Sequence, residues 1–317
     1  MSEVEWTPID GFSKIFDGNR DAGHKIIGLN APLFGTTTAT IKNLDLNVNI
    51  ATSSSAYYNA TTKVMALGGL ACYSGGPISD STVSGSVYWS HKTSTYTYIF
   101  VGGFVGQALD GTSFSNVDNK ANISAEKHNN TTFLGGIAAM AGVSSGADVS
   151  FYDCTNSGTI KVNEKTVTGE TNRNSYVAGI LGASNVNVSF EDCSNSGAIT
   201  HEKAYTKNAY VAGIYGRNFS SVNVQFKNLT NTGAITSNTT CREGMGIGGI
   251  LGEHTSKEGN NIASDLTNTG AITVGGTPAS TVYIGGIAGR YDGVSGKNNT
   301  VTTWTNSGAV VIDLSAP

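Results

Sequence analysis

Charged side chains are scarce in this chain of 317 residues. Asp, Glu, Lys and Arg make up 13% of the sequence, against about a quarter in an average soluble protein. The formal net charge of -4 is mild and gives no basic surface for nucleic acid or an anionic membrane. We therefore expect no nucleic acid as a partner, and attachment to a membrane only through an anchor. No apolar run approaches the about 20 residues of a membrane-spanning helix, so the sequence contains no candidate for one.

Cysteine is also rare, and no pattern favours a metal site or a catalytic centre. Four cysteines are too few for the disulfide framework of a small secreted domain. Neither the Cys-His spacing of zinc sites nor a His-Glu-x-x-His segment is present, and the five histidines are scattered. We therefore predict a protein without metal, cofactor or catalytic residues.

Glycine, in contrast, is abundant, with 41 residues, and much of it belongs to an internal repeat. A motif of two small residues between apolar ones, such as Leu67-Gly-Gly-Leu70, occurs seven times. The near-constant period of its copies is typical of repeat architectures, in which each unit stacks on its neighbours. The second glycines of the copies are Gly69, Gly103, Gly136, Gly179, Gly213, Gly249 and Gly286.

A second motif alternates with the first. The segment Cys154-Thr-Asn-Ser-Gly-Thr-Ile160 recurs in four close copies, and a degenerate copy begins at Val117. Alternating segments such as Val149-Ser-Phe151 precede it and favour strands over helices. We therefore predict an all-β protein, a single-stranded parallel β-helix (β-solenoid) of about eight coils with right-handed winding. Residues 31–317 are expected to form this solenoid, and residues 1–30 an irregular segment that caps it.

Equivalent positions of the repeat are expected to stack into ladders, three of them apolar and directed into the core. A fourth ladder consists of asparagines, whose side-chain amides are expected to hydrogen-bond from coil to coil. The apolar ladders are Phe114, Phe151, Phe190, Phe226, Ala263 and Val301; Val117, Cys154, Cys193, Leu229, Leu266 and Trp304; and Ile123, Ile160, Ile199, Ile235, Ile272 and Val310. The asparagines are Asn119, Asn156, Asn195, Asn231, Asn268 and Asn306.

The glycines and cysteines of the two motifs carry further expectations. The glycine two residues after a ladder asparagine, such as Gly158, is expected to adopt a positive φ at a corner. A bend at the Gly-Gly motif is expected to turn both of its apolar neighbours into the core. Cys154 and Cys193 stack on adjacent coils, where two buried thiols are favoured and a disulfide is the alternative.

The first coil resembles a known family. Its segments resemble the start of GLUG-motif domains, although residues 20–22 interrupt the pattern, and the later Gly-Gly-Ile-Leu-Gly252 and Gly-Gly-Ile-Ala-Gly289 match the repeats of that family. The resemblance covers about Phe16 to Val310. It implies a secreted β-solenoid of the kind found in bacterial surface proteins and adhesins, and the Asn-Ser/Thr-Gly variant resembles surface proteins of gut Bacteroides-type bacteria. The segments are Phe16-Asp-Gly-Asn19, His24-Lys-Ile-Ile-Gly-Leu29, Pro32-Leu-Phe-Gly35 and Ala39-Thr-Ile-Lys-Asn-Leu-Asp-Leu46.

Aromatic residues outside the ladders indicate a binding site in the first complete coils. Exposed rings can stack on sugars or anchor a protein partner. The alternative is that several of these residues belong to the core or the cap. The predicted ligand-binding residues are Tyr57, Tyr58, Tyr88, Trp89 and Tyr96, with Tyr73 and Tyr98 nearby.

Carboxylates recur at one position of the repeat. Asp153, Asp192 and Asp265 occupy it, but Asn228 and Thr303 replace them in other coils. This variation favours a solvated stripe on the outside of the solenoid over a metal or catalytic site.

Together these features predict a non-catalytic extracellular adhesin or ligand-binding solenoid at the cell surface, which recognises its partner through the loops between coils. The expected partner is a host glycan, or a host or bacterial surface protein. The alternatives are a carbohydrate-active β-helix enzyme (a polysaccharide lyase or hydrolase) and a structural spacer that carries another domain. We also expect a removed secretory signal or lipid anchor, and a further domain or a partner at the bare strand edge of the last coil.

Overall fold

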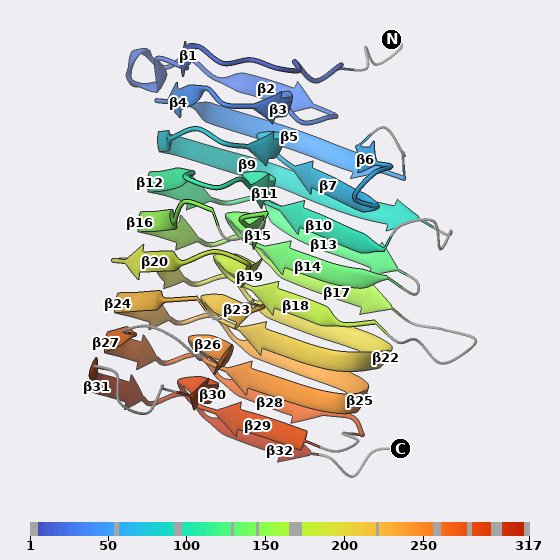
Figure 1. The fold of residues 1–317 in the computed structure, drawn as a ribbon, viewed down its shortest axis with the longest axis vertical. Helices are drawn as coiled ribbons and strands as arrows, with labels where there is room; N and C mark the ends of the chain where they lie inside the picture. The colour runs from blue at the N-terminus through green and yellow to red at the C-terminus, as the bar shows by residue number, and fades with distance from the viewer. Residues whose placement is uncertain are drawn as a thin grey trace.

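The computed structural model shows a β-solenoid whose parallel strands stack along one long axis, from the N-terminal coil to the C-terminal coil (Figure 1). It describes residues 6–53, 57–91, 97–127, 130–143, 146–164, 173–219, 222–255, 261–277, 281–292 and 300–313. The strands form one sheet of 24 strands and one of eight. The predicted all-β class and parallel solenoid are therefore confirmed.

Each complete coil runs through four segments, of which the first ends in the Gly-Gly motif and the second lies in the eight-stranded sheet. The Gly-Gly segments are β7 (Val64–Gly68), β10 (Tyr98–Gly102), β14 (Thr131–Gly135), β18 (Ser175–Ala178), the last parts of β22 (Ile199–Ala212) and β25 (Ile235–Gly248), and β29 (Thr281–Gly285). The eight-stranded sheet contains β3 (Phe34–Thr37), β8 (Ala71–Ser74), β11 (Val105–Ala108), β15 (Ala138–Ala141), β19 (Leu181–Ser184), β23 (Tyr215–Asn218), β26 (Leu251–Thr255) and β30 (Ala288–Asp292).

The third and fourth segments lie on either side of the Asn-x-Gly corner. The third segments are β4 (Thr40–Lys42), the first part of β9 (Ile78–His91), β12 (Ser113–Asn119), β16 (Val149–Asn156), β20 (Val188–Glu191) with β21 (Ser194–Asn195), β24 (Val224–Asn231), β27 (Ile262–Asn268) and β31 (Thr300–Asn306). The fourth segments are β5 (Asp45–Thr52), the last part of β9, β13 (Asn122–Lys127), β17 (Ile160–Glu164), the first parts of β22 and β25, β28 (Ile272–Gly275) and β32 (Val310–Asp313).

The number of turns corrects the prediction. The solenoid makes about six turns, whereas the sequence pattern predicts about eight coils. The chain enters the eight-stranded sheet once on each of eight passes, but no Gly-Gly segment precedes β3 on the first pass. The seven Gly-Gly segments from β7 to β29 bound six intervals, which agrees with about six turns between the first and the last of them.

The predicted bend at the Gly-Gly motif is present. Leu67 and Leu70 are both completely buried in the main core, although residues three apart on a straight strand face opposite sides. The chain bends between β7 and β8 at these glycines. A Cβ on Gly69 would lie 2.5 Å from the carbonyl oxygen of Gly103 in the next coil, so the tight stacking of the bends requires glycine there.

Apolar ladders fill the interior. Phe114, Phe151, Phe190 and Phe226 are in register and stack with ring centroids 4.9 to 5.6 Å apart. The isoleucine ladder is in register from Ile123 to Val310, through β13, β17, β22, β25, β28 and β32. Every coil therefore adds one layer to the same continuous core.

The stacked cysteines are free. Cys154 and Cys193 are both buried, and neither is part of a disulfide, in agreement with the favoured expectation. Burial raises the pKa of the Cys154 thiol well above its usual value. Both residues act as apolar side chains of the second ladder.

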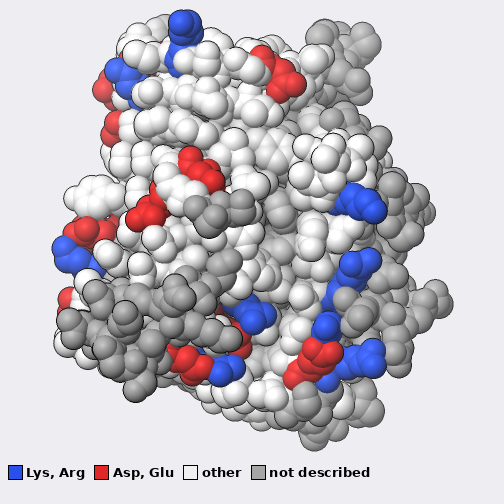
Figure 2. Space-filling model, viewed as in Figure 1, with Lys and Arg blue, Asp and Glu red and all other residues white. Residues whose placement is uncertain are grey.

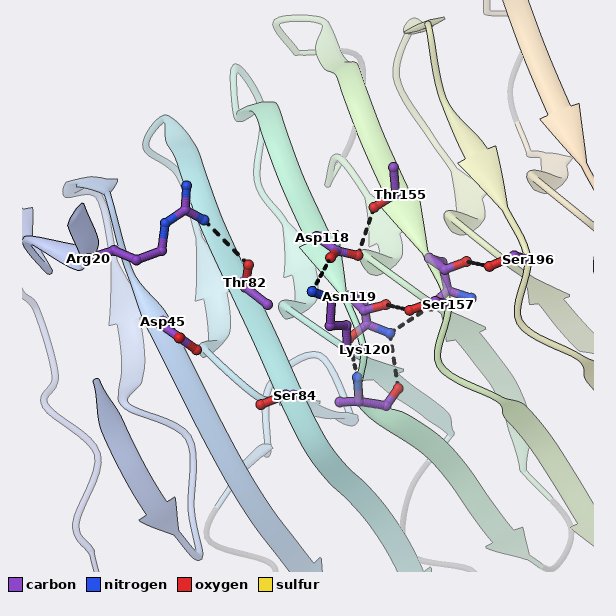
Figure 3. Close-up of polar contacts among 12 residues, drawn as sticks. Arg20, Asp45, Thr82, Ser84, Asp118, Asn119, Lys120, Thr155, Ser157 and Ser196 are labelled. Carbon is purple, nitrogen blue, oxygen red and sulfur yellow. Dashed lines mark hydrogen bonds and ion pairs between the residues drawn. The ribbon is translucent and has the colours of Figure 1, made fainter. Parts of the chain in front are cut away.

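The ladder asparagines form a continuous line of hydrogen bonds inside the solenoid. From Asn119 to Asn268, Nδ2 of each donates to Oδ1 of the next over 2.6 to 2.8 Å. Figure 3 shows outer polar contacts at the same corner, where the Thr155 hydroxyl donates to Asp118 Oδ1 over 2.7 Å. The Ser157 hydroxyl donates to the Asn119 carbonyl of the preceding coil. The corner is thus linked between coils both inside and outside.

The expectation of positive φ at the corner glycines is wrong. None of the described glycines that follow a ladder asparagine has a positive φ. A Cβ on Gly197 would lie 2.0 Å from the carbonyl oxygen of Gly158 in the neighbouring coil, so close stacking explains the glycine. The left-handed conformation occurs instead three residues before the asparagine position, at Asn43, Asp80, Asn116, Asp153, Asp192, Asn228, Asp265 and Thr303.

Residues 6–29 cover the first coil, where the sequence predicts a cap from residues 1–30. The segment is more regular than expected, because it contains β1 (Ile15–Asp17), a 3-10 helix (Arg20–Ala22) and β2 (Ile26–Leu29). Strand β1 pairs with β4, and β2 pairs with β5. The rings of Phe12 and Phe16 pack on Phe34, each with centroids 5.5 Å apart. The first edge of the solenoid is therefore closed by paired strands and apolar contacts.

Candidate functional site: an aromatic cleft

The bend at the Gly-Gly motif creates a cleft on the outside of the solenoid, which we call the aromatic cleft. Two strands meet at the bend, and on each of them every second side chain points away from the core. These outward side chains face one another in the cleft. They form a second apolar cluster, separate from the main core. One wall carries Ala66, Phe100, Phe133, Tyr176 and Tyr210 in register, and the other Tyr73, Gln107, Met140, Ala183 and Arg217.

The aromatic cleft opens into a cavity of about 620 Å³. Its floor is apolar, its rim carries amides and hydroxyls, and none of its described lining residues is charged. Figure 2 shows mostly uncharged surface over β10, β14 and β15, with a group of acidic side chains left of the centre and further charges toward the margins and the C-terminal coils. The lining residues are Thr36, Asn59, Thr62, Val64, Tyr73, Tyr98, Phe100, Gln107, Leu109, Phe133, Met140, Val143, Asn185 and Phe219.

Aromatic rings form the floor and two edges of the cavity. Phe100 meets Phe133 edge to face at 4.8 Å, and Phe133 stacks on Tyr176 at 4.6 Å. These three rings are buried. Phe219, which follows β23, lies over Phe133 and Tyr176 at 5.7 and 4.8 Å. Phe219 is 41% exposed and Tyr98 is 40% exposed, so two rings remain accessible to a ligand.

Three amides that line the cavity are held in place by hydrogen bonds within the protein. Gln107 Nε2 donates to the Gly142 carbonyl over 2.9 Å, and Asn185 Nδ2 donates to the Val143 carbonyl over 3.4 Å. Asn59 Oδ1 accepts the backbone N–H groups of residues 61 and 62 over 3.0 and 3.1 Å. One polar atom of each amide is thus fixed. The side-chain oxygens of Gln107 and Asn185 can accept a hydrogen bond from a ligand, and the side-chain nitrogen of Asn59 can donate one.

The C-terminal part of the aromatic cleft is filled by charged side chains. Glu253 is buried, and its Oε1 lies 3.0 Å from Arg217 Nε, while its Oε2 lies 3.9 Å from a terminal nitrogen of Arg290. The guanidinium of Arg217 covers the Tyr210 ring at 4.4 Å, and that of Arg290 covers the Tyr283 ring at 5.0 Å. Burial raises the pKa of the Glu253 carboxyl, and the two guanidinium groups act in the opposite direction. This network closes the cleft at its C-terminal end.

The five predicted ligand-binding residues do not form one patch. Trp89 is completely buried in the main core, so its assignment to a surface site is wrong. Adjacent strand residues face opposite sides, and Tyr88 accordingly lies outside, where its hydroxyl donates to Glu126 over 2.5 Å. Tyr58 packs on the main core and Tyr57 on both clusters. Tyr96 lies outside the described residues.

Sequence reasoning missed the rings that build the aromatic cleft, although a signal exists. The residue before the first apolar residue of the Gly-Gly motif is aromatic in five of seven copies. The strand period of two places this position outside the core, where a polar residue is usual, so a column of rings there indicates a second apolar surface. The five residues are Phe100, Phe133, Tyr176, Tyr210 and Tyr283.

The repeated carboxylates lie at the left-handed corner. Asp153, Asp192 and Asp265 all have positive φ, and Asn228 Nδ2 donates to Asp192 Oδ1 over 2.6 Å. Asx side chains tolerate this conformation better than other residues, which explains why the position alternates between Asp and Asn. Over the described ranges, no group of three or more His, Cys, Asp or Glu residues is arranged to hold a metal ion.

Comparison of the chain with protein-family models, with curated proteins and with solved structures finds no match. The part of the chain that the structure describes contains no helix long and apolar enough to cross a membrane.

Proposed function

We propose that this chain is a non-catalytic ligand-binding β-solenoid of the cell surface, an extracellular adhesin that holds its ligand in the aromatic cleft. The aromatic cleft is the observation that supports this function best. Its volume of about 620 Å³ lies within the usual range of ligand sites, roughly 300 to 1,000 Å³. The core does not need the open rings of Tyr98 and Phe219, and a spacer gains nothing from exposing them.

The aromatic cleft also modifies the expected mode of recognition. Val143, Asn185 and Phe219 line the cavity from the connections that follow β15, β19 and β23. Residues between the coils therefore contribute to the site, but the rigid strands beneath them supply its floor. A site on such strands is held more precisely in shape than a site made of loops alone.

The cellular setting belongs to the same proposal. Its support is the resemblance to GLUG-motif surface proteins of Bacteroides-type bacteria and the uncharged, Gly-rich composition. Right-handed winding is also proposed, because connections between parallel strands are overwhelmingly right-handed.

The test is a binding screen of the purified chain against host glycans and against host and bacterial surface proteins. We expect Tyr98→Ala and Phe219→Ala each to weaken binding about tenfold, since a lost ring stack costs on the order of 1 kcal/mol. Tyr152→Ala is the matched control, because Tyr152 is 52% exposed but does not line the cavity. Binding that survives both cleft substitutions would contradict the proposed site, and turnover of a bound polysaccharide would contradict the non-catalytic function.

A further inference from the structure

We infer that the ligand of the aromatic cleft is an uncharged oligosaccharide that lies along the axis of the solenoid. This inference rests on the proposed function and specifies the chemistry and orientation of the ligand. It depends on three features of the cleft: the charge of its lining, the combination of rings with amides, and its length.

The lining of the cavity favours an uncharged ligand. None of the described residues that line it is charged. At the C-terminal end of the aromatic cleft, Arg217 pairs with Glu253, and Arg290 pairs with Asp292 and Glu253. Both guanidinium groups lie over tyrosine rings. An anionic group in the cavity would lose its hydration without gaining an ion pair there, which is costly.

The combination of rings and amides favours a sugar over an apolar molecule. A pyranose ring has an apolar face that stacks on aromatic side chains and a rim of hydroxyls that needs donors and acceptors. Tyr98 and Phe219 offer the open rings. Gln107, Asn185 and Asn59 offer amide groups whose opposite ends are already fixed. An alkyl chain would bury those amides without partners, at a cost of a few kcal/mol.

An extended peptide fits the aromatic cleft less well than a sugar. Peptides that bind to sheets add a strand at an open edge, where main-chain hydrogen bonds hold them. Strands β10 and β14 on one wall pair with a neighbour on both sides, as do β11 and β15 on the other. These four strands therefore have no free edge. The strand β6 (Tyr58–Asn59), which pairs with β7 and carries Asn59 to the cavity, has only two residues, too few to hold an extended peptide, so recognition falls to side chains.

The cavity is long, and its length runs along the solenoid. Thr36, Tyr73, Gln107 and Met140 occupy the same register position on four successive strands of the eight-stranded sheet. Asn185 and Phe219 follow the next two strands. Because the Phe219 ring lies back over Phe133, at 5.7 Å, the length is set by the strands from Thr36 to Met140. Three strand spacings of about 4.8 Å give about 14 Å, which suits a short chain of sugar rings. The Arg217–Glu253–Arg290 network lies beyond its C-terminal end.

The experiment is isothermal titration calorimetry of the full chain with uncharged manno-, xylo- and cello-oligosaccharides of increasing length. Oligogalacturonides serve as acidic probes and myristate as an apolar probe. We expect affinity for one uncharged series to rise with each added ring until the cavity is filled and then to level off. The affinity should not change with salt concentration, because no ion pair forms between the ligand and the protein. Phe219→Ala and Tyr98→Ala should each lower it about tenfold, while Tyr152→Ala should leave it unchanged, with thermal unfolding confirming that every variant is folded.

The outcomes separate this inference from the proposed function. If no uncharged oligosaccharide binds, but a surface protein binds and Phe219→Ala weakens that binding, the inference is wrong and the function stands. Tighter, salt-dependent binding of oligogalacturonides, or binding of myristate alone, also overturns the inference. If every ligand that is found binds equally to the two cleft variants and the original chain, both the inference and the proposed site are wrong.

Discussion

The left-handed corner shows how a single backbone angle selects residues at this position of the repeat. Eight residues three positions before the asparagine ladder have φ between 49° and 57°. Seven are Asn or Asp, whose short polar side chains tolerate this conformation, and one is Thr303. A β-branched residue is strained there because its Cβ carries two heavy atoms close to the backbone. The recurring Asp and Asn residues therefore resemble an acidic site, but the backbone angle of the corner explains why they are there.

Replacing Thr303 by Asn should therefore stabilise the protein. Thr303 has a φ of 54°, and removing this strain should raise the free energy of unfolding by about 1 kcal/mol. Urea unfolding of Thr303→Asn against the original chain measures the change. Thr302→Asn is the matched control, since Thr302 lies in the regular pairing of β31 with β27. An equal gain in the control would show that the effect is not due to the left-handed angle.

A buried histidine should make the protein sensitive to acid. His254 is completely buried, near the Tyr291 ring and the charge of Asp292. Burial is the main cause that lowers its pKa from 6.5 to about 4, although the nearby Asn261 side chain and the charge of Asp292 act in the opposite direction. As the pH falls, the His254 imidazole therefore becomes protonated at a higher pH in the unfolded chain than in the folded protein.

The stability that His254 contributes is present above pH 6.5 and is lost as the pH falls from 6.5 to about 4. The difference between the two pKa values corresponds to about 3 kcal/mol. Chemical unfolding of the original chain and of His254→Gln across this range measures the loss. The original chain should lose more stability than the variant on acidification. Parallel curves for the two proteins would contradict the assignment to His254.

At the scale of the structural element, the asparagine ladder links neighbouring coils through buried amides. Asn195 is buried and exchanges hydrogen bonds with Asn156 and Asn231, and its Nδ2 also donates to the Gly197 carbonyl. At the end of the ladder, Asn306 accepts from Asn268 and is exposed. The cost of removing an amide should therefore depend on its place in the ladder.

Asn195→Ala should destabilise the protein by roughly 3 kcal/mol, because it leaves two buried neighbours with unsatisfied groups. Asn306→Ala should cost less than about 1 kcal/mol, because water can replace its partner. Thermal unfolding of both variants tests this difference. Equal losses at the two positions would mean that the amides contribute to local turns and not to a continuous ladder.

The sequence was sufficient to predict most of the solenoid elements but not the aromatic cleft. Ladders such as Phe114 to Phe226 follow from equivalent positions of one repeat, and stacking them requires no knowledge of the coil shape. The aromatic cleft depends on the bend between two strands, which brings the outward side of each strand against the other. The prediction grouped Tyr88 and Trp89 because they are neighbours in sequence, whereas the cleft gathers Phe100, Phe133 and Phe219 from different coils.

At the scale of the whole molecule, each coil is held mainly by the coils on either side of it. Interior coils have two such neighbours, and the first coil is covered by residues 6–29. The last coil packs on one side only among the described residues. Its inward positions Val301 and Val310 are 48% and 38% exposed, whereas Ile160 in an interior coil is fully buried. Stability in a solenoid is close to a sum over neighbouring interfaces, so it should fall toward this end.

Hydrogen exchange should reveal this gradient. Backbone amides of β29, β31 and β32 should exchange much faster than those of β14, β16 and β17, because opening the last coil breaks one interface and opening an interior coil breaks two. Mass spectrometry of peptides after deuterium labelling measures both regions in one experiment. Asn195→Ala should increase exchange in the interior coils next to it, while Asn306→Ala should affect only the last coil. Uniform protection along the whole solenoid would mean that it unfolds as a single cooperative unit, and the additive description of its stability would then be wrong.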